Sequence, residues 1–173
     1  MLRSARSVRR LRPVPPRPPA RRNVDHDISQ SPDGATLTAL RRFLLILLAV
    51  SFPGTLAELV LLGHTEDTLQ FVPIVLLAVG FLVVVWHWLV HSRLSVRVLQ
   101  GTMIAFVISG GVGVFFHFKG NIEWELEGDA SMGGFLLFRE AMMGAVPSLA
   151  PGTMALLGAV GLVYAWRHPA LRL

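Results

Sequence analysis

One acidic side chain, Glu58, stands inside an otherwise apolar run of the sequence, Phe43–Leu62. A carboxylate is costly to place in a bilayer, and acids kept there commonly serve proton relays, cation sites or buried ion pairs. A plainer explanation is that Glu58 lies near enough to the end of its run to reach the membrane surface. Glu58 is therefore a candidate metal ligand, or a group that lines the path of an oligomeric transporter or channel.

Histidines supply a second possible chemistry. His64 and His117 fall at the ends of two apolar runs, and neutral imidazoles there can bind haem iron or a transition metal. They are the candidate cofactor-binding residues, and with Glu58 the candidate metal site. No HExxH, CxxCH or other ligand spacing accompanies them, so the simplest expectation is that no cofactor binds. His87, His91 and His168 are expected near the opposite ends of the runs.

Acidic and apolar residues alternate in Ile122–Glu127 (IEWELE). A period of two is typical of a half-buried strand, which would project Glu123, Glu125 and Glu127 from one face. Carboxylates suit hard cations such as Ca²⁺, but alternate strand positions lie too far apart to share one ion without bending. We interpret the three acids, together with Trp124, as a docking surface for a basic partner.

Several classes of reaction find no support in the sequence. The chain has no cysteine, which excludes disulfides, thiolate metal sites and thiol catalysis. It has no GxSxG elbow and no glycine-rich phosphate loop ending in Lys-Ser or Lys-Thr. We therefore expect a protein that is not an enzyme.

The elements that position these residues are apolar runs of membrane length. The chain is 53% hydrophobic with a mean hydropathy of +0.56, and about 20 helical residues cover a hydrocarbon core of roughly 30 Å. The runs are Phe43–Leu62, Phe71–Val90, Val98–Phe118 and Ala150–Trp166, of which the last is short. They predict an all-α membrane domain of four transmembrane helices over 37–173, with an outer segment at 119–149. Within that segment, Phe135–Val146 fits a short helix lying in the membrane surface.

Basic residues set the direction of these spans. Fourteen of the 16 fall in 1–42, 91–97 and 167–173, whereas the loops expected on the outer side hold only Lys119 and Arg139 beside seven acids. The positive-inside rule then places both chain ends in the cytoplasm. A basic tail beside membrane spans faces anionic lipid, so we expect no nucleic-acid partner.

Residues 1–36 are predicted to be a disordered cytoplasmic tail, because clustered Arg and Pro offer little apolar surface to offset the entropy of ordering. Its Arg-rich, acid-free start also fits a mitochondrial presequence, and PVPPRPP fits a ligand of an SH3-like groove. The expected location is a bacterial inner membrane, with the mitochondrial inner membrane as the alternative.

Small residues recur at helical spacing in the last two runs. Gly110 and Gly113 in the third, and Gly158 in the fourth, allow helix backbones to approach closely. These two runs are predicted to contact each other or a partner subunit.

Two stretches carry a resemblance. HFKGNIEWELE (117–127) and APGTMALLGAVGLVYAWRHP (150–169) resemble segments of small bacterial inner-membrane proteins with four spans and no assigned activity. The resemblance covers roughly the last third of the chain. It implies a membrane location, and it implies that His117, Asn121 and Glu123 belong to a recurrent pattern, as does the sequence Arg167-His168-Pro169.

The features together favour a non-catalytic accessory or interaction subunit of a membrane complex, associated with a protein partner or a second copy of the chain. Two alternatives stay open. One is a small haem- or metal-binding redox protein using His64, His117 and Glu58. The other is an oligomeric transporter or channel using Glu58.

Overall fold

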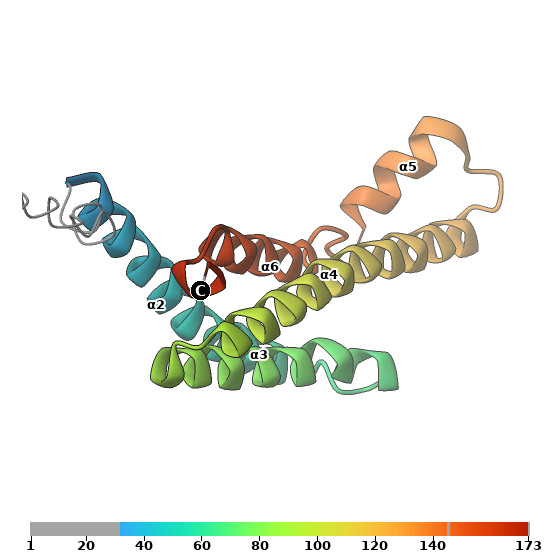
Figure 1. Cartoon of the computed structure of the whole chain (residues 1–173). Helices are drawn as coiled ribbons and strands as arrows, with labels where there is room; N and C mark the ends of the chain where they lie inside the picture. The colour runs from blue at the N-terminus through green and yellow to red at the C-terminus, as the bar shows by residue number, and fades with distance from the viewer. Residues whose placement is uncertain (1–31, 145, 173) are drawn as a thin grey trace, which may run out of the picture. The chain divides into compact units, whose positions relative to one another are not determined.

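A computed structural model describes residues 32–144 and 146–172. The Arg/Pro-rich stretch 1–31 lies outside them, and so does the prediction that it is disordered. The described elements are α2 (Pro32–Leu61), η1 (Thr68–Gln70), α3 (Phe71–Val90), α4 (Arg93–Gly128), α5 (Gly134–Met143), α6 (Gly152–Ala165) and η2 (Pro169–Leu171) (Figure 1). These residues contain no strand, so the all-α prediction is confirmed for them.

Three of the helices are long and apolar enough to cross a membrane. The most apolar 18-residue windows of Asp33–Leu61, Thr68–Val90 and Arg93–Gly128 have mean hydropathies of 2.2, 2.6 and 1.8. α6 is also apolar but has only 14 residues, so its length alone does not make it a span. Length and composition therefore indicate a membrane protein, with three helices of the described residues able to span the bilayer, and α6 falls short of the length predicted for the fourth span.

The structure corrects two predictions made from the sequence. α2 begins at Pro32, so the last residues of the segment 1–36 are helical. The predicted strand Ile122–Glu127 is wrong, because α4 runs without a break to Gly128. Glu, Leu and Trp tolerate a helix well, and Lys119 pairs with Glu123 one turn on at 3.3 Å. The segment 119–149 is thus mostly helix, with α5 close to its predicted position.

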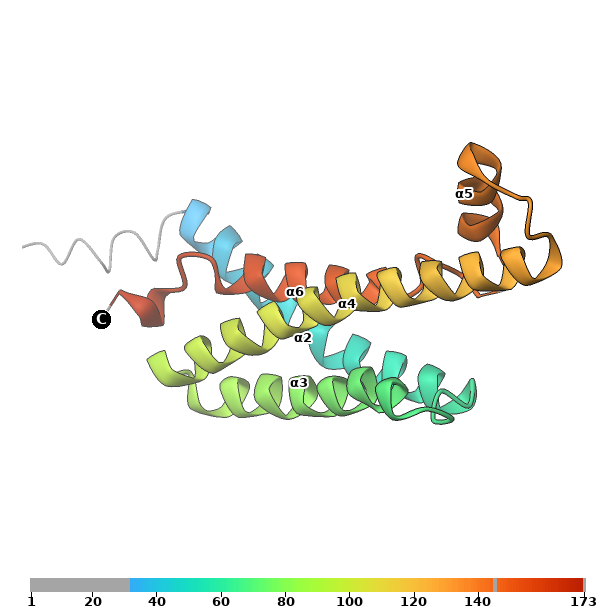
Figure 2. The same cartoon turned by 90° about the vertical axis from the view of Figure 1, so that its right-hand side faces the viewer.

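α4 is the element on which the others are arranged. It runs beside α6 and α3, and α5 folds back on its far end (Figure 2). The contact with α6 is close because it is made by glycines: a Cβ on Gly158 would lie 2.6 Å from the Met103 carbonyl oxygen, and one on Gly110 would meet the backbone of Ala155. The predicted contact between these two apolar runs is confirmed.

α2 joins this assembly through large side chains instead. Phe52 of α2 and Phe106 of α4 are both fully buried, with ring centroids 4.9 Å apart. Gly80 of α3 leaves the space that the Phe106 ring occupies. Leu48 and Leu77 complete this part of the core. The core extends from this part of the helices to Tyr164 and Ala165 near the end of α6, and polar side chains gather at the two ends of the helices.

Candidate functional site

A chain of buried polar side chains joins α3, α4 and α6 at one end of the helices. His87 is fully buried; its Nδ1 lies 2.7 Å from Ser95 Oγ and its Nε2 lies 2.6 Å from the Tyr164 hydroxyl. The Tyr164 hydroxyl is in turn 3.3 Å from Nε2 of His168. We call these four residues the histidine network. Each partner comes from a different helix or turn, so the network fixes how their ends meet.

Short local motifs bring these residues together. Ser92 caps the N-terminus of α4 and exchanges hydrogen bonds with Ser95, which holds the Ser95 hydroxyl against α3. After α6, Arg167 adopts a left-handed backbone conformation (φ 48°), which turns His168 back toward Tyr164. Arg41 of α2 donates to the carbonyls of Trp166 and Arg167, at 3.4 and 3.3 Å, and so supports that turn.

The charges around His168 are all positive. Burial lowers the pKa of His168, and the nearby Arg41 and His91 lower it further. The His91 ring lies 5.5 Å from that of His87, and the His168 ring lies 5.4 Å from it, so three imidazoles share this end. No carboxylate of the described residues is bonded to any of them. The site therefore favours the neutral form of His168.

At the opposite end of the α4–α6 pair, one amide side chain holds the returning chain. Nδ2 of Asn121 donates to the carbonyls of Ala141 and Val146, at 2.9 and 2.7 Å, and lies 3.0 Å from Ser148 Oγ. Ser148 donates to the same Ala141 carbonyl. Non-helical backbone is tolerated near a membrane only where its polar groups have partners. We call this group the Asn121 cluster. It provides hydrogen-bond partners for the backbone carbonyls at the turn between α5 and α6.

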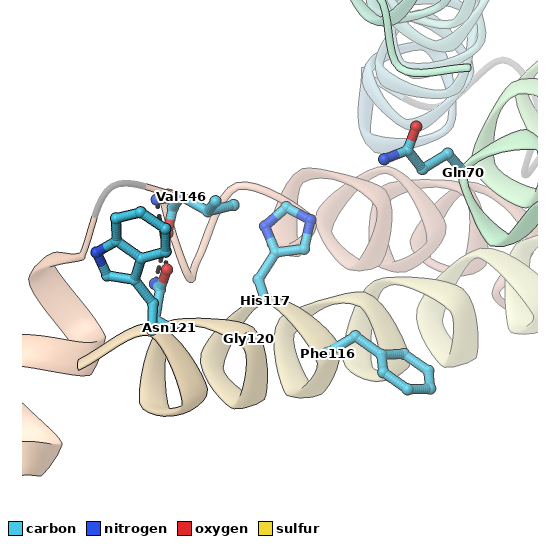
Figure 3. A pocket seen from close by; sticks show the side chains of 7 residues that line it. Gln70, Phe116, His117, Gly120, Asn121 and Val146 are labelled. Carbon is cyan, nitrogen blue, oxygen red and sulfur yellow. Dashed lines mark hydrogen bonds between the residues drawn. The ribbon is translucent and has the colours of Figure 1, made fainter. Parts of the chain in front are cut away.

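An open cleft of about 450 Å³ lies beside the Asn121 cluster (Figure 3). His117 and Gln70 face each other across it. The side-chain oxygen of Gln70 accepts from the backbone N–H of Glu66 at 2.8 Å, which leaves its NH₂ group toward the cleft. Nδ1 of His117 lies 3.2 Å from the Pro147 carbonyl, an acceptor, so Nδ1 carries the hydrogen and Nε2 keeps a free lone pair.

The candidate metal ligands of the sequence are only partly brought together. His64 and His117 lie near each other: burial lowers the pKa of His64, and His117 lowers it further. Glu58 is exposed on α2, one turn before the helix ends at Leu61. Among residues 32–144 and 146–172, no group of three or more His, Asp or Glu side chains could hold a metal ion.

The acidic residues lie on a helix rather than a strand, which changes the surface they form. Glu123 and Glu127 are four residues apart and share one exposed face of α4, whereas Glu125 is half-buried. Trp124 is 67% exposed between them. The continuous three-carboxylate face expected from the alternation is therefore not formed, but an exposed aromatic with two acids beside it is.

Sequence reasoning placed three histidines at one end but missed the residues that join them. Neither Tyr164 nor Ser95 was a candidate, although a histidine in an apolar helix needs partners when it is buried. The opposite charge-derived directions of the third and fourth runs already put Tyr164 and Ser95 at the same end of the helices. Asn121 was noted only within the resemblance, because a single amide before a turn carries no distinctive spacing.

Comparison with protein-family models, with curated proteins and with solved structures finds no match to this chain.

Proposed function

We propose that the chain crosses its membrane four times, with both ends in the cytoplasm, as a bacterial inner-membrane protein. The pairing of α6 with α4 supports the fourth crossing. Pro151 contacts α4 at Gly113 and Gly161 contacts it at Met103, so α6 lies along α4 over most of its length. The 14 residues of α6 cover about 21 Å, and the turns that flank the helix would complete a crossing of the roughly 30 Å hydrocarbon core. The Asn121 cluster then provides hydrogen-bond partners for the backbone just before α6.

The same arrangement agrees with the charge-based direction. Arg41, Arg93, Arg97 and Arg167 gather around the histidine network, whereas the Asn121 end carries Lys119 and Arg139 among most of the acids. Because basic residues are retained on the cytoplasmic side, the histidine network faces the cytoplasm and the cleft faces outward.

We propose further that this protein is a non-catalytic interaction subunit, and that the hairpin of α4 and α5 binds its protein partner. The observation that carries this is the length of α4. Its 36 residues span about 54 Å, which exceeds the membrane core, so roughly 17 Å of helix beyond His117 projects outward. Ala141 is buried against that projection and the rings of Phe118 and Phe138 meet at 5.7 Å, so the hairpin is a packed structure.

The outward hairpin exposes side chains that are unusual for a solvated surface. Trp124 is 67% and Phe135 79% exposed, and Glu123 and Glu127 lie beside the tryptophan. Exposed aromatics with charged neighbours are typical of binding surfaces. A basic partner with an apolar centre fits this surface.

A matched pair of tryptophans tests the proposal. Trp124 and Trp166 are about equally exposed, at 67% and 69%, but lie at opposite ends. The wild-type chain, extracted gently from its native membrane, should migrate as a complex with a co-purifying protein. Trp124→Ala should release that protein, and Trp166→Ala should retain it. A lone monomer, or equal loss in both variants, contradicts the proposal.

Metal or haem binding is a second candidate, favoured by the orientation of His117. Histidine ligands commonly donate one ring N–H to a carbonyl and bind metal through the other nitrogen, and His117 has that arrangement with His64 nearby. The test is the visible absorption spectrum and metal content of protein purified from its native membrane. A Soret band or bound metal that His117→Ala abolishes would support it, and the absence of both would remove it.

A further inference from the structure

The histidine network has one direction of hydrogen bonding, which its two ends determine. At one end, the Ser95 hydroxyl donates to the carbonyl of Ser92 at 2.9 Å. A hydroxyl has a single hydrogen, so Ser95 Oγ must accept from Nδ1–H of His87. His87 Nε2 is then the unprotonated nitrogen, and it accepts from the Tyr164 hydroxyl.

The other end imposes the same direction. The backbone N–H of Ala170 donates to Nδ1 of His168 at 3.3 Å. Neutral His168 therefore carries its hydrogen on Nε2 and donates it to the Tyr164 oxygen. A reversed chain would set the Nδ1–H of His168 against the N–H of Ala170, so it is excluded. The order of donation is His168 to Tyr164 to His87 to Ser95.

This order leaves no vacant nitrogen on either imidazole. A proton can add only to a nitrogen lone pair, and both lone pairs already accept hydrogen bonds: His87 Nε2 from Tyr164, and His168 Nδ1 from Ala170. The His87 bond is the shorter, at 2.6 Å, and is fully buried. The first proton therefore goes to Nδ1 of His168, where the bond is 3.3 Å long and the side chain is 9% exposed.

We propose that His168 is a proton-operated latch, and that uptake of one proton from the cytoplasm at its Nδ1 releases the C-terminal turn η2. The proton forms a new N–H bond at Nδ1, which can no longer accept from Ala170. His168 is the N-cap of η2. Ala170 and Leu171 belong to this turn and pack against the core cluster. Loss of the cap frees these two residues and exposes the ends of α3 and α6.

The surroundings oppose the charged form from every side. Arg41 approaches from α2, His87 and His91 from α3, Tyr164 from α6 and Arg167 from the turn itself. None of these groups can neutralise an imidazolium. Protonation and the closed turn are therefore mutually exclusive, and the latch opens as the cytoplasm becomes acidic.

Amide hydrogen exchange on the full chain in detergent or nanodiscs tests the latch. After correction for the intrinsic effect of pH, exchange in 166–172 should rise about fivefold between about pH 8 and about pH 5, the effect of losing one N-cap bond. The segment Gly134–Met143, which contains no histidine, should show no such step in the same sample. This comparison needs no variant and decides the matter even if substitutions fail to fold.

Two variants separate a latch from a static cap. His168→Asn keeps an oxygen that can accept from Ala170 but cannot titrate, so it should abolish the step while preserving protection. His64→Asn, at the other end of the helices, should leave the step unchanged. No excess exchange in the wild type, or an equal step in His168→Asn, would overturn the proposal.

Discussion

The two ends of the α4–α6 pair are closed by different chemistry. At one end, imidazole, phenol and hydroxyl groups bond to one another, and the geometry depends on which nitrogen holds a proton. At the other end, the amide of Asn121 bonds mainly to backbone carbonyls and does not titrate. Between them, glycines hold the helices at close distance. One end is therefore closed by a group that does not titrate, and the other by hydrogen bonds that depend on the protonation of histidines.

The largest effect is expected where the fixed closure is broken. Asn121→Ala removes the side-chain donor of the Val146 carbonyl and one of the two side-chain donors of the Ala141 carbonyl, at a cost of about 3 kcal/mol in free energy of unfolding. Asn121→Asp should cost at least as much near neutral pH, because a carboxylate offers acceptors to those carbonyls. Denaturant titration in detergent measures both costs. A cost for Asn121→Ala below about 1 kcal/mol would show that the Asn121 cluster does not hold this end closed.

Breaking the titratable closure should have a smaller effect. Tyr164→Phe preserves the ring but removes the hydroxyl, so that His87 Nε2 loses its donor and His168 Nε2–H loses its acceptor. We expect a loss of about 1.5 kcal/mol in the free energy of unfolding. Tyr164 is the only tyrosine of the chain, so loss of the tyrosine Raman signal verifies the substitution. An unchanged stability would mean that the hydrogen bond is not formed.

Acidification should weaken only the histidine end. Because the pKa of folded His168 lies below its usual 6.5, its contribution to stability is complete above that value and is lost as pH falls toward the folded pKa. We expect a decline of less than about 1 kcal/mol, absent in His168→Asn. Hydrogen bonds from Ser131 lower the pKa of Asp129, so that carboxylate loses its contribution only at more acidic pH. If the decline persists in His168→Asn, another titrating group causes it.

The smallest effect is expected on the exposed part of α4. The ion pair between Lys119 and Glu123 spans 3.3 Å, with both side chains more than half exposed. Water screens such pairs, so Lys119→Ala should change the free energy of unfolding by about 0.5 kcal/mol or less. A larger loss in the same denaturant titration would show that the projecting hairpin depends on this pair.

The sequence predicted those features that depend on local composition. Apolar run length located α2, α3 and the apolar part of α4, and glycine spacing predicted the contact between α4 and α6. It failed at Ile122–Glu127, where alternation suggested a strand but the preceding helix simply continues. A pattern of six residues cannot distinguish these outcomes, because helix propagation needs only one more hydrogen bond per residue.

The candidate sites could be predicted only in part, because their members are far apart in the chain. His87 and Tyr164 are separated by 77 positions, and Asn121 and Ser148 by 27. Their partnership depends on the register of α6 against α4, which close contacts such as Gly158 with Met103 determine. That register is a packing result, and no motif in the sequence encodes it.

The sidedness of the two closures tests the four-span topology directly. The chain has no cysteine, so single cysteines can be introduced at Ser131, next to the projecting hairpin, and at Arg172, beyond the latch. A membrane-impermeant maleimide applied to intact cells should label position 131 and spare position 172 until the membrane is opened. Labelling of both positions in intact cells would contradict a fourth crossing by α6, and with it the placement of the two closures on opposite faces.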